Sequence, residues 1–254
     1  MHTNALLLIV ASAMLLGALS PAHGSAQADS GRFVTRDVRI AGETHRYAVW
    51  LPPGHASQGS WPAVLFLHGS GECGIDGLKP THVGFGPALT AHPERWPFVV
   101  VFPQKPLDTE EWWERETLAL GVLDDAIKAF HIDAARVALA GMSQGGHGAW
   151  LIGARHAERF RCLVPICGYA RARAVQTRAL ALPVWAFHGL RDDVVDPLDT
   201  RHCIAALTEE RKARGMDTTE VRMTLFPEAN HDAWDPAFAT PELPGWIAAH
   251  TQKH

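Results

Sequence analysis

The chain has 254 residues, of which 47% are hydrophobic and 20% are charged, and its formal net charge is −4. This composition is typical of a folded globular protein with enough apolar material for one large core. The small negative charge gives no electrostatic reason to expect binding to nucleic acid or to an anionic membrane surface.

The N-terminal segment differs from the rest of the chain because residues 1–28 contain no Lys, Arg, Asp or Glu. Residues 5–19 form an apolar run, and residues 26–28 (Ala-Gln-Ala) fit the small-residue site that signal peptidase cleaves. We predict a signal peptide over residues 1–28, although no Lys or Arg precedes the apolar run. The mature chain, residues 29–254, is then one exported domain in the periplasm or outside the cell, without stable membrane insertion. The alternatives are an uncleaved membrane anchor and a miscalled start codon.

The four cysteines all lie in the predicted mature chain, at positions 73, 162, 167 and 203. Export permits disulfide bonds. Cys162 and Cys167 lie in one predicted strand, and at ~3.3 Å per residue they are too far apart to bridge. Free or buried thiols are the simpler interpretation, and spacing leaves open whether Cys73 or Cys203 forms a bridge.

The apolar pattern predicts a sheet. Two segments, 33–41 and 45–51, alternate apolar and polar residues around a turn at 42–43, which is typical of an antiparallel hairpin at a sheet edge. Continuous apolar runs, typical of parallel strands buried on both faces, follow at 63–67, 98–102, 136–140, 162–166 and 183–187. Residues 221–226 are predicted to add a final strand.

Helical periodicity separates these strands. We predict helices over residues 116–130, from Ser143 to about 156, over 198–213 and from about 234 to 250. The alternation predicts an α/β fold with a mostly parallel, doubly wound sheet of about eight strands. Ligands of such sheets bind beyond the carboxyl ends of the strands, where the candidate residues below all lie.

Residues 141–145 read Gly-Met-Ser-Gln-Gly, between a predicted strand and a predicted helix. In this context G-x-S-x-G is typical of a nucleophile elbow, a sharp turn that exposes a serine above the sheet. The turn is so tight that side chains at 141 and 145 would collide with the backbone, which explains the two glycines. We therefore predict that Ser143 is a nucleophile.

A serine hydroxyl needs a base to remove its proton, and the base needs an acid that orients it. His231 lies in the loop after the final predicted strand, so we predict that it is the base. The acid is expected in the loop after strand 183–187, where Asp192, Asp193 and Asp196 all qualify and spacing does not choose among them. His188, at the end of that strand, is interpreted as a structural residue.

The oxyanion of the reaction needs two backbone N–H donors. Gln144, directly after the serine, is expected to supply one. The glycine-rich loop 68–71 (His-Gly-Ser-Gly) is expected to supply the other, through Ser70 or through a neighbouring glycine.

Three further residues are candidates for the substrate pocket. Trp112 and Trp113 follow the strand 98–102 and could form an apolar wall, with core packing nearly as plausible. His147, one turn into the helix after Ser143, could contact the pocket, and packing against its neighbours on the helix face is the favoured alternative. No His-x-His or His-Glu-x-x-His pair indicates a metal site, and we expect neither a metal nor a cofactor.

Four segments together resemble secreted α/β-hydrolases of the carboxylesterase/phospholipase and dienelactone-hydrolase-like group, which includes predicted peptidases and polyhydroxybutyrate-depolymerase-like esterases. The resemblance is carried by residues 65–72, 141–146, 188–195 and 230–234, and it covers about residues 33–250. It implies the α/β-hydrolase fold. It also implies that Asp192 is the acid, because the pattern His-Gly-x-x-Asp-x-x-Val carries the acid in this group.

One departure from the resemblance concerns the loop after Gly71. Relatives often have Gly-Glu-Arg-Gly there, whereas this chain has Cys73 in the place of the arginine. The partner of Glu72 is therefore left open.

These patterns predict an exported serine hydrolase that cleaves carboxylic esters through Ser143, His231, Asp192 and an acyl-enzyme intermediate. The substrate is expected to be a small-molecule or polymer-linked ester, because no insertion is long enough for a large lid. A prolyl-oligopeptidase-like peptidase with the same residues is the alternative. A non-catalytic binding protein on a hydrolase scaffold is a third hypothesis, which fits less well because no triad member is missing.

Overall fold

A computed structural model describes residue 1 and residues 30–57, 59–176 and 181–252. The predicted signal peptide, apart from Met1, lies outside the described residues. Among the helices in the described ranges, none is long and apolar enough to cross a membrane.

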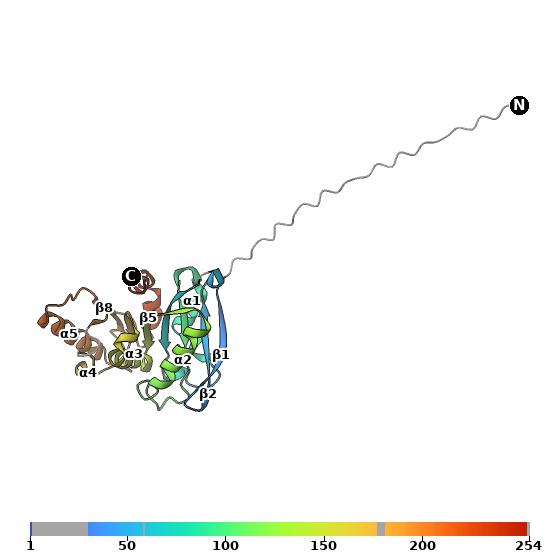
Figure 1. The fold of residues 1–254 in the computed structure, drawn as a ribbon. Coiled ribbons are helices and arrows are strands. Elements are labelled where there is room, and N and C mark those ends of the chain that lie inside the picture. The colour runs from blue at the N-terminus through green and yellow to red at the C-terminus, as the bar shows by residue number, and fades with distance from the viewer. Residues whose placement is uncertain (2–29, 58, 177–180, 253–254) are drawn as a thin grey trace.

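One eight-stranded sheet forms the centre of the molecule, in the order β1-β2-β4-β3-β5-β6-β7-β8 (Figure 1). The strands are β1 (Arg32–Ile40), β2 (Glu43–Leu51), β3 (Trp61–Leu67), β4 (Val99–Phe102), β5 (Ile132–Met142), β6 (Leu163–Ile166), β7 (Val184–Gly189) and β8 (Val221–Phe226). Strand β2 is antiparallel to both β1 and β4, and all other neighbours are parallel. The predicted sheet with its N-terminal hairpin is confirmed.

Helices cover both faces of the sheet. One face carries α2 (Glu116–Ala129), α3 (Gln144–Arg155) and α5 (Pro197–Ala213), and the short α4 (Ala172–Gln176) packs against α5. The other face carries α1 (Phe85–Ala91), α6 (Trp234–Ala239) and α7 (Leu243–His250). Single 3₁₀ turns occur at His55–Ser57, Ser70–Glu72, Lys79–Thr81, Pro93–Arg95 and Ala157–Arg159.

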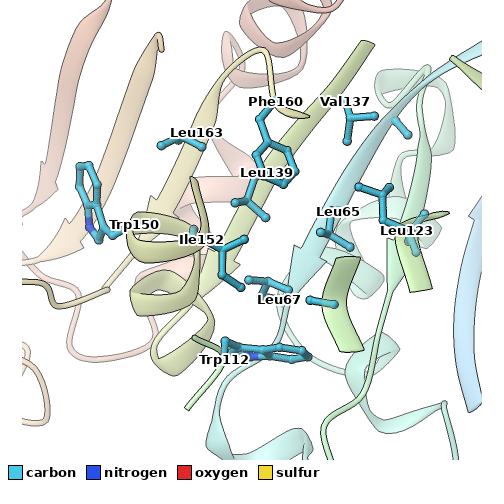
Figure 2. Close-up of a cluster of buried hydrophobic side chains, with 14 of the residues drawn as sticks. Leu65, Leu67, Trp112, Leu123, Val137, Leu139, Trp150, Ile152, Phe160 and Leu163 are labelled. Carbon is cyan, nitrogen blue, oxygen red and sulfur yellow. The ribbon is translucent and has the colours of Figure 1, made fainter. Parts of the chain in front are cut away.

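Strand β3 is buried along its whole length, which explains why its sequence is apolar throughout. Leu65 and Leu67 pack into the core beneath α2 and α3, whereas Val64 and Phe66 pack into the core on the opposite face. Figure 2 shows Leu67 beside Ile152 of α3. A strand with helices on both sides has no solvent-facing side, so every position is apolar.

Three details of the prediction are wrong. The single helix predicted over residues 234–250 is two helices, because α6 ends at Ala239 and the next residue, Thr240, has the extended ψ of 120° that is expected before Pro241. Helix α1 was not predicted at all. The hairpin turn falls at Ala41 and Gly42, with φ of 50° and 90°, rather than at residues 42–43.

All four cysteines are free thiols. Cys73 is half-buried and the other three are buried. The simpler of the two interpretations of the cysteines is therefore the one that the structure supports.

Candidate active site

Ser143 occupies a sharp turn between β5 and α3. Its φ of 55° and ψ of −120° are unfavourable for a residue with a side chain, and such strain is typical of functional sites. A Cβ atom added at Gly141 would lie 2.1 Å from the Gly145 carbonyl oxygen, and one added at Gly145 would lie 1.9 Å from the Leu67 carbonyl oxygen. The predicted need for two glycines is confirmed.

The imidazole of His231 lies between Ser143 and Asp192. Its Nε2 is 2.9 Å from the Ser143 Oγ, and its Nδ1 is 2.8 Å from the Asp192 Oδ2. Because a carboxylate only accepts, Nδ1 carries the proton, which leaves the Nε2 lone pair for the serine hydroxyl. The structure thus brings together the three residues predicted as nucleophile, base and acid, from loops that follow β5, β7 and β8.

The Asp192 carboxylate is completely buried and fixed by the backbone. Its Oδ1 accepts hydrogen bonds from the N–H groups of Val194 and Val195, both at 2.9 Å. Burial alone would raise the pKa of Asp192, but the Val195 N–H, the His231 imidazole and the Val194 N–H together lower it below its usual value. The acid therefore stays ionised and can stabilise a protonated imidazole.

The other aspartates of this loop do different things. Asp193 is exposed. Asp196 caps α5, where its carboxylate accepts the N–H of Leu198 at 2.9 Å. Of the three candidates that spacing left open, only Asp192 is hydrogen-bonded to His231.

His188 supports the acid from the side opposite to His231. Its buried Nε2 lies 3.1 Å from both the Asp192 Oδ2 and the Val195 carbonyl oxygen, and its Nδ1 lies 2.8 Å from the Thr200 hydroxyl. Burial lowers the pKa of His188, so its ring is neutral at neutral pH. The structural interpretation of His188 agrees with these contacts, but its contact with Asp192 was not foreseen.

The two expected oxyanion donors flank Ser143. Gln144 is the first residue of α3 and Ser70 is the first residue of a 3₁₀ turn, so neither N–H has an acceptor within its own helix. Both residues line the cavity that contains Ser143. A Cβ atom added at Gly69 would lie 3.4 Å from the Ser143 Cβ, so the loop lies directly beside the serine.

His68 is completely buried, and its hydrogen bonds fix the loop that contains Ser70. Its Nδ1–H donates to the Gly69 carbonyl oxygen at 2.6 Å, and its Nε2 accepts the Lys105 N–H at 3.2 Å. The Trp112 indole N–H donates to the His68 carbonyl oxygen at 2.9 Å. These roles require a neutral ring, and burial accordingly lowers the pKa of His68 to about 3.

The charge of a lysine from another segment of the chain acts on Glu72. Burial raises the pKa of the Glu72 carboxyl, while the Gly69 N–H and the charge of Lys105 act in the opposite direction. Lys105 is completely buried, and its ammonium group donates to the Cys73 Sγ at 3.1 Å and to the Leu107 carbonyl oxygen at 2.9 Å. Cys73 therefore contacts a lysine from the loop after β4. The resemblance implies an arginine at position 73 itself.

The cavity beside Ser143 measures about 390 Å³ and is lined by Ser70, Ser143, Gln144, Tyr169, Val194, Val195, Asp196 and Asp199. Neither predicted tryptophan is among these residues. Trp112 is completely buried in the core under α3, where Figure 2 shows it beside Leu67, so its prediction as a pocket wall is wrong. Trp113 lies away from the cavity, with the guanidinium of Arg155 over its ring at 5.6 Å.

His147 lines an adjoining hollow of about 440 Å³, which shares Tyr169 and Asp199 with the cavity beside Ser143. Glu111 joins the two aromatic groups, because it accepts the Tyr169 hydroxyl at 2.6 Å and lies 3.1 Å from the His147 Nδ1. The sequence analysis missed Glu111 and Tyr169. Both lie in loops without a motif, and no pattern in the sequence indicates their proximity.

Solved structures similar to this chain include esterases and related hydrolases. A thermostable esterase is 24% identical with a TM-score of 0.71, over 85% of this chain and 62% of its own, so this chain spans less than two thirds of that protein. The feruloyl esterase module from Clostridium thermocellum is 15% identical with a TM-score of 0.70, over 89% of this chain and 91% of its own. An S-formylglutathione hydrolase from Agrobacterium tumefaciens is 18% identical with a TM-score of 0.64, over 89% of this chain and 97% of its own.

No family model and no curated protein matches the sequence. The structural likenesses and the strand order define the α/β-hydrolase fold, as the resemblance implied. Because the sequence identities are this low, the similar structures define the fold of this chain and not its activity.

The neutral state of His68 generates a testable prediction about stability. An unfolded histidine has a pKa of about 6.5, whereas burial lowers the pKa of His68 to about 3 in the folded protein. Between these values only the unfolded chain binds the proton, so this contribution to the free energy of unfolding is complete above pH 6.5 and falls as the pH drops toward 3. We expect His68→Asn to reduce the pH dependence of that free energy by up to about 1.4 kcal/mol per pH unit.

The measurement is urea denaturation at a series of pH values between 4 and 7. His82→Asn, at an exposed histidine, is the matched control and should leave the slope unchanged. Equal slopes for His68→Asn and the wild type would contradict the assignment.

Proposed function

We propose that this protein is a serine hydrolase that cleaves carboxylic esters. The observation that carries the proposal is the unbroken hydrogen-bond chain from the Ser143 Oγ through the His231 imidazole to the buried Asp192 carboxylate. The names of the structurally similar proteins, which include esterases and an S-formylglutathione hydrolase, support ester chemistry over peptide hydrolysis.

In the first half of the proposed reaction, the Ser143 Oγ attacks the carbonyl carbon while its proton passes to the His231 Nε2. Asp192 stabilises the imidazolium that forms. The N–H groups of Ser70 and Gln144 donate to the negatively charged oxygen of the tetrahedral intermediate. The intermediate then collapses, the bond to the alcohol breaks, and the alcohol leaves with the proton from His231.

In the second half, a water molecule gives a proton to the His231 Nε2 and attacks the acyl carbon. The second tetrahedral intermediate breaks its bond to the Ser143 Oγ, which takes the proton back, and the carboxylic acid leaves. Apart from the attacking water, these steps use side chains and backbone groups of this chain. The cavity of about 390 Å³ suits a modest acyl or alcohol group, either in a small ester or at an accessible ester of a polymer.

Removal of the nucleophile tests the proposal. Ser143→Ala should abolish covalent labelling by a fluorophosphonate probe and lower the kcat/KM for p-nitrophenyl acetate by at least about 10³-fold, because the acyl-enzyme cannot form. His231→Gln should show a loss of similar size. The matched control is Asp193→Asn, at the exposed neighbour of the acid, which should keep near wild-type activity.

A wild-type protein without labelling and without ester hydrolysis would support a non-catalytic binding protein instead. Faster cleavage of a peptide anilide than of p-nitrophenyl acetate would favour the peptidase alternative. Either result rejects the proposed ester hydrolase.

Tyr169 generates a prediction about acyl-chain length. Its side chain lines both the cavity beside Ser143 and the adjoining hollow, so Tyr169→Ala should join the two spaces. We expect the ratio of kcat/KM for p-nitrophenyl octanoate over acetate to rise about tenfold, equivalent to about 1.4 kcal/mol. Tyr169→Phe keeps the ring and removes only the hydrogen bond to Glu111, so its ratio should stay near that of the wild type. An unchanged ratio in Tyr169→Ala would exclude the hollow as an acyl subsite.

We also propose that the protein is exported, on the strength of the uncharged apolar segment and the Ala-Gln-Ala sequence at residues 26–28. Expression of the full chain in a Gram-negative bacterium should yield a mature protein that begins at or near residue 29. N-terminal sequencing of the periplasmic fraction measures this. Recovery of the uncleaved chain in the membrane fraction would instead support a membrane anchor.

A further inference from the structure

Cys167 lies beside the His231–Asp192 pair and has no part in the proposed reaction. It directly follows β6 and is completely buried. One ligand atom from each of Cys167, Asp192 and His231 lies within 4.8 Å of the other two. Across the described part of the chain, this is the one group of three metal-ligating side chains that lie so close together.

The backbone holds Cys167 in an unusual conformation. Four non-glycine residues in the described ranges have a positive φ, namely Ala41, His131, Ser143 and Cys167. The φ of Cys167 is 39°, and its N–H donates to the Phe187 carbonyl oxygen at 2.8 Å. A conformation of this kind costs of order 1–3 kcal/mol and persists only where the surroundings enforce it. The position of the thiol is therefore set by the fold.

We propose that Cys167, Asp192 and His231 form an inhibitory binding site for a soft divalent cation such as Zn²⁺ or Cd²⁺. A thiolate, a carboxylate and an imidazole are the ligands of many zinc sites. Ligand atoms on a tetrahedral zinc ion lie roughly 3.3–3.7 Å apart. The 2.8 Å between the His231 Nδ1 and the Asp192 Oδ2 must widen by about half an ångström, and the longest separation must shrink by about one.

The charges of the three ligands favour this class of cation. The thiolate and the carboxylate together balance the two positive charges of the ion, so the buried complex is nearly neutral. The attraction between these charges offsets the free-energy cost of removing them from water. A thiolate also selects Zn²⁺ and Cd²⁺ over Mg²⁺ and Ca²⁺, which prefer oxygen ligands. The ion reaches the buried ligands past His231, because the His231 side chain is 18% exposed whereas the side chain of Asp192 is not exposed at all.

Binding of the cation stops the proposed reaction. The Cys167 thiol loses its proton to water as its sulfur bonds to the ion, and no electron is transferred. The nitrogen of His231 that faces Asp192 binds the ion instead of donating to the carboxylate, so the ring proton moves to Nε2. A protonated Nε2 cannot accept the proton of the Ser143 hydroxyl. The inhibitory effect rests on the proposed hydrolase function, whereas binding of the ion does not.

The experiment compares the wild type with Cys167→Ala and with a control, Cys203→Ala, which removes another buried thiol that is bonded to the Ala170 carbonyl oxygen and does not belong to the cluster of three ligands. Each protein is incubated with ZnCl₂ or CdCl₂, and p-nitrophenyl acetate hydrolysis is measured before and after addition of EDTA. Cadmium binding is followed independently through the ultraviolet absorbance of the cadmium–thiolate bond.

We expect reversible inhibition of the wild type by Zn²⁺ and Cd²⁺ but not by Mg²⁺ or Ca²⁺. Cys167→Ala should raise the half-inhibitory concentration at least about tenfold, as loss of a ligand does, and should lose the absorbance of one cadmium–thiolate bond. Cys203→Ala should match the wild type in both readouts.

Equal inhibition of the wild type and Cys167→Ala would overturn the proposal and locate the effect at another site. An unchanged cadmium absorbance in Cys167→Ala would overturn it as well. A wild type that hydrolyses no ester without metal would instead reject the proposed function, and the absorbance would still decide whether the three residues bind the ion.

Discussion

The geometry of the site depends on how closely the N-terminus of α3 approaches the ends of the central strands. A Cβ atom at Gly145 would collide with the carbonyl oxygen of Leu67 in β3, and one at Gly146 would lie 2.5 Å from that of Ile166 in β6. Any side chain at these positions would push the helix away from the sheet. The approach places the Ser143 hydroxyl at the edge of the sheet and the Gln144 N–H next to it, so one backbone contact positions both groups.

The three members of the hydrogen-bond chain differ in how firmly they are held. Asp192 is fixed by two backbone N–H groups and by two histidines, and its side chain is fully buried. His231 has two polar partners within the chain and a partly exposed ring. A buried, fixed acid and a base that the substrate and water can reach suit a group that must pass a proton in two directions. The same exposure of His231 gives a cation its route to Cys167.

Much of the fold is predictable because buried parallel strands and amphipathic helices leave different apolar patterns in the sequence. The elbow is predictable because its glycines are required by local backbone contacts. The pocket wall is not, as the tryptophan pair shows: Trp112 is buried because Gly148 lets it approach α3, where an added Cβ would lie 2.6 Å from the Trp112 Cβ. Trp113, its neighbour, faces outward. Only the packing of distant segments distinguishes them.

The choice among the three loop aspartates shows the same limit. Their spacing is compatible with any of them, and the choice depends on which carboxylate the backbone turns toward His231. The split of the final helix was readable, since Pro241 lies in the sequence and favours an extended residue before it. Glu111 has no local signal, because its partners Tyr169 and His147 are 58 and 36 residues away.

The oxyanion loop shows how one electrostatic task can be met from a different part of the chain. Glu72 is partly buried beside the Gly69 N–H, and a buried carboxylate needs a nearby positive charge to remain ionised. The charges of Lys105 and Lys79 oppose the effect of burial on the pKa of Glu72, and the Lys105 backbone N–H also fixes the His68 ring beneath the same loop. The side chain of Lys105 thus acts on Glu72 and its backbone acts on His68, and both of these residues support the loop that carries Ser70. The loop that carries Ser70 and Cys73 is therefore supported from residue 105, through the charge of its side chain and through its backbone N–H.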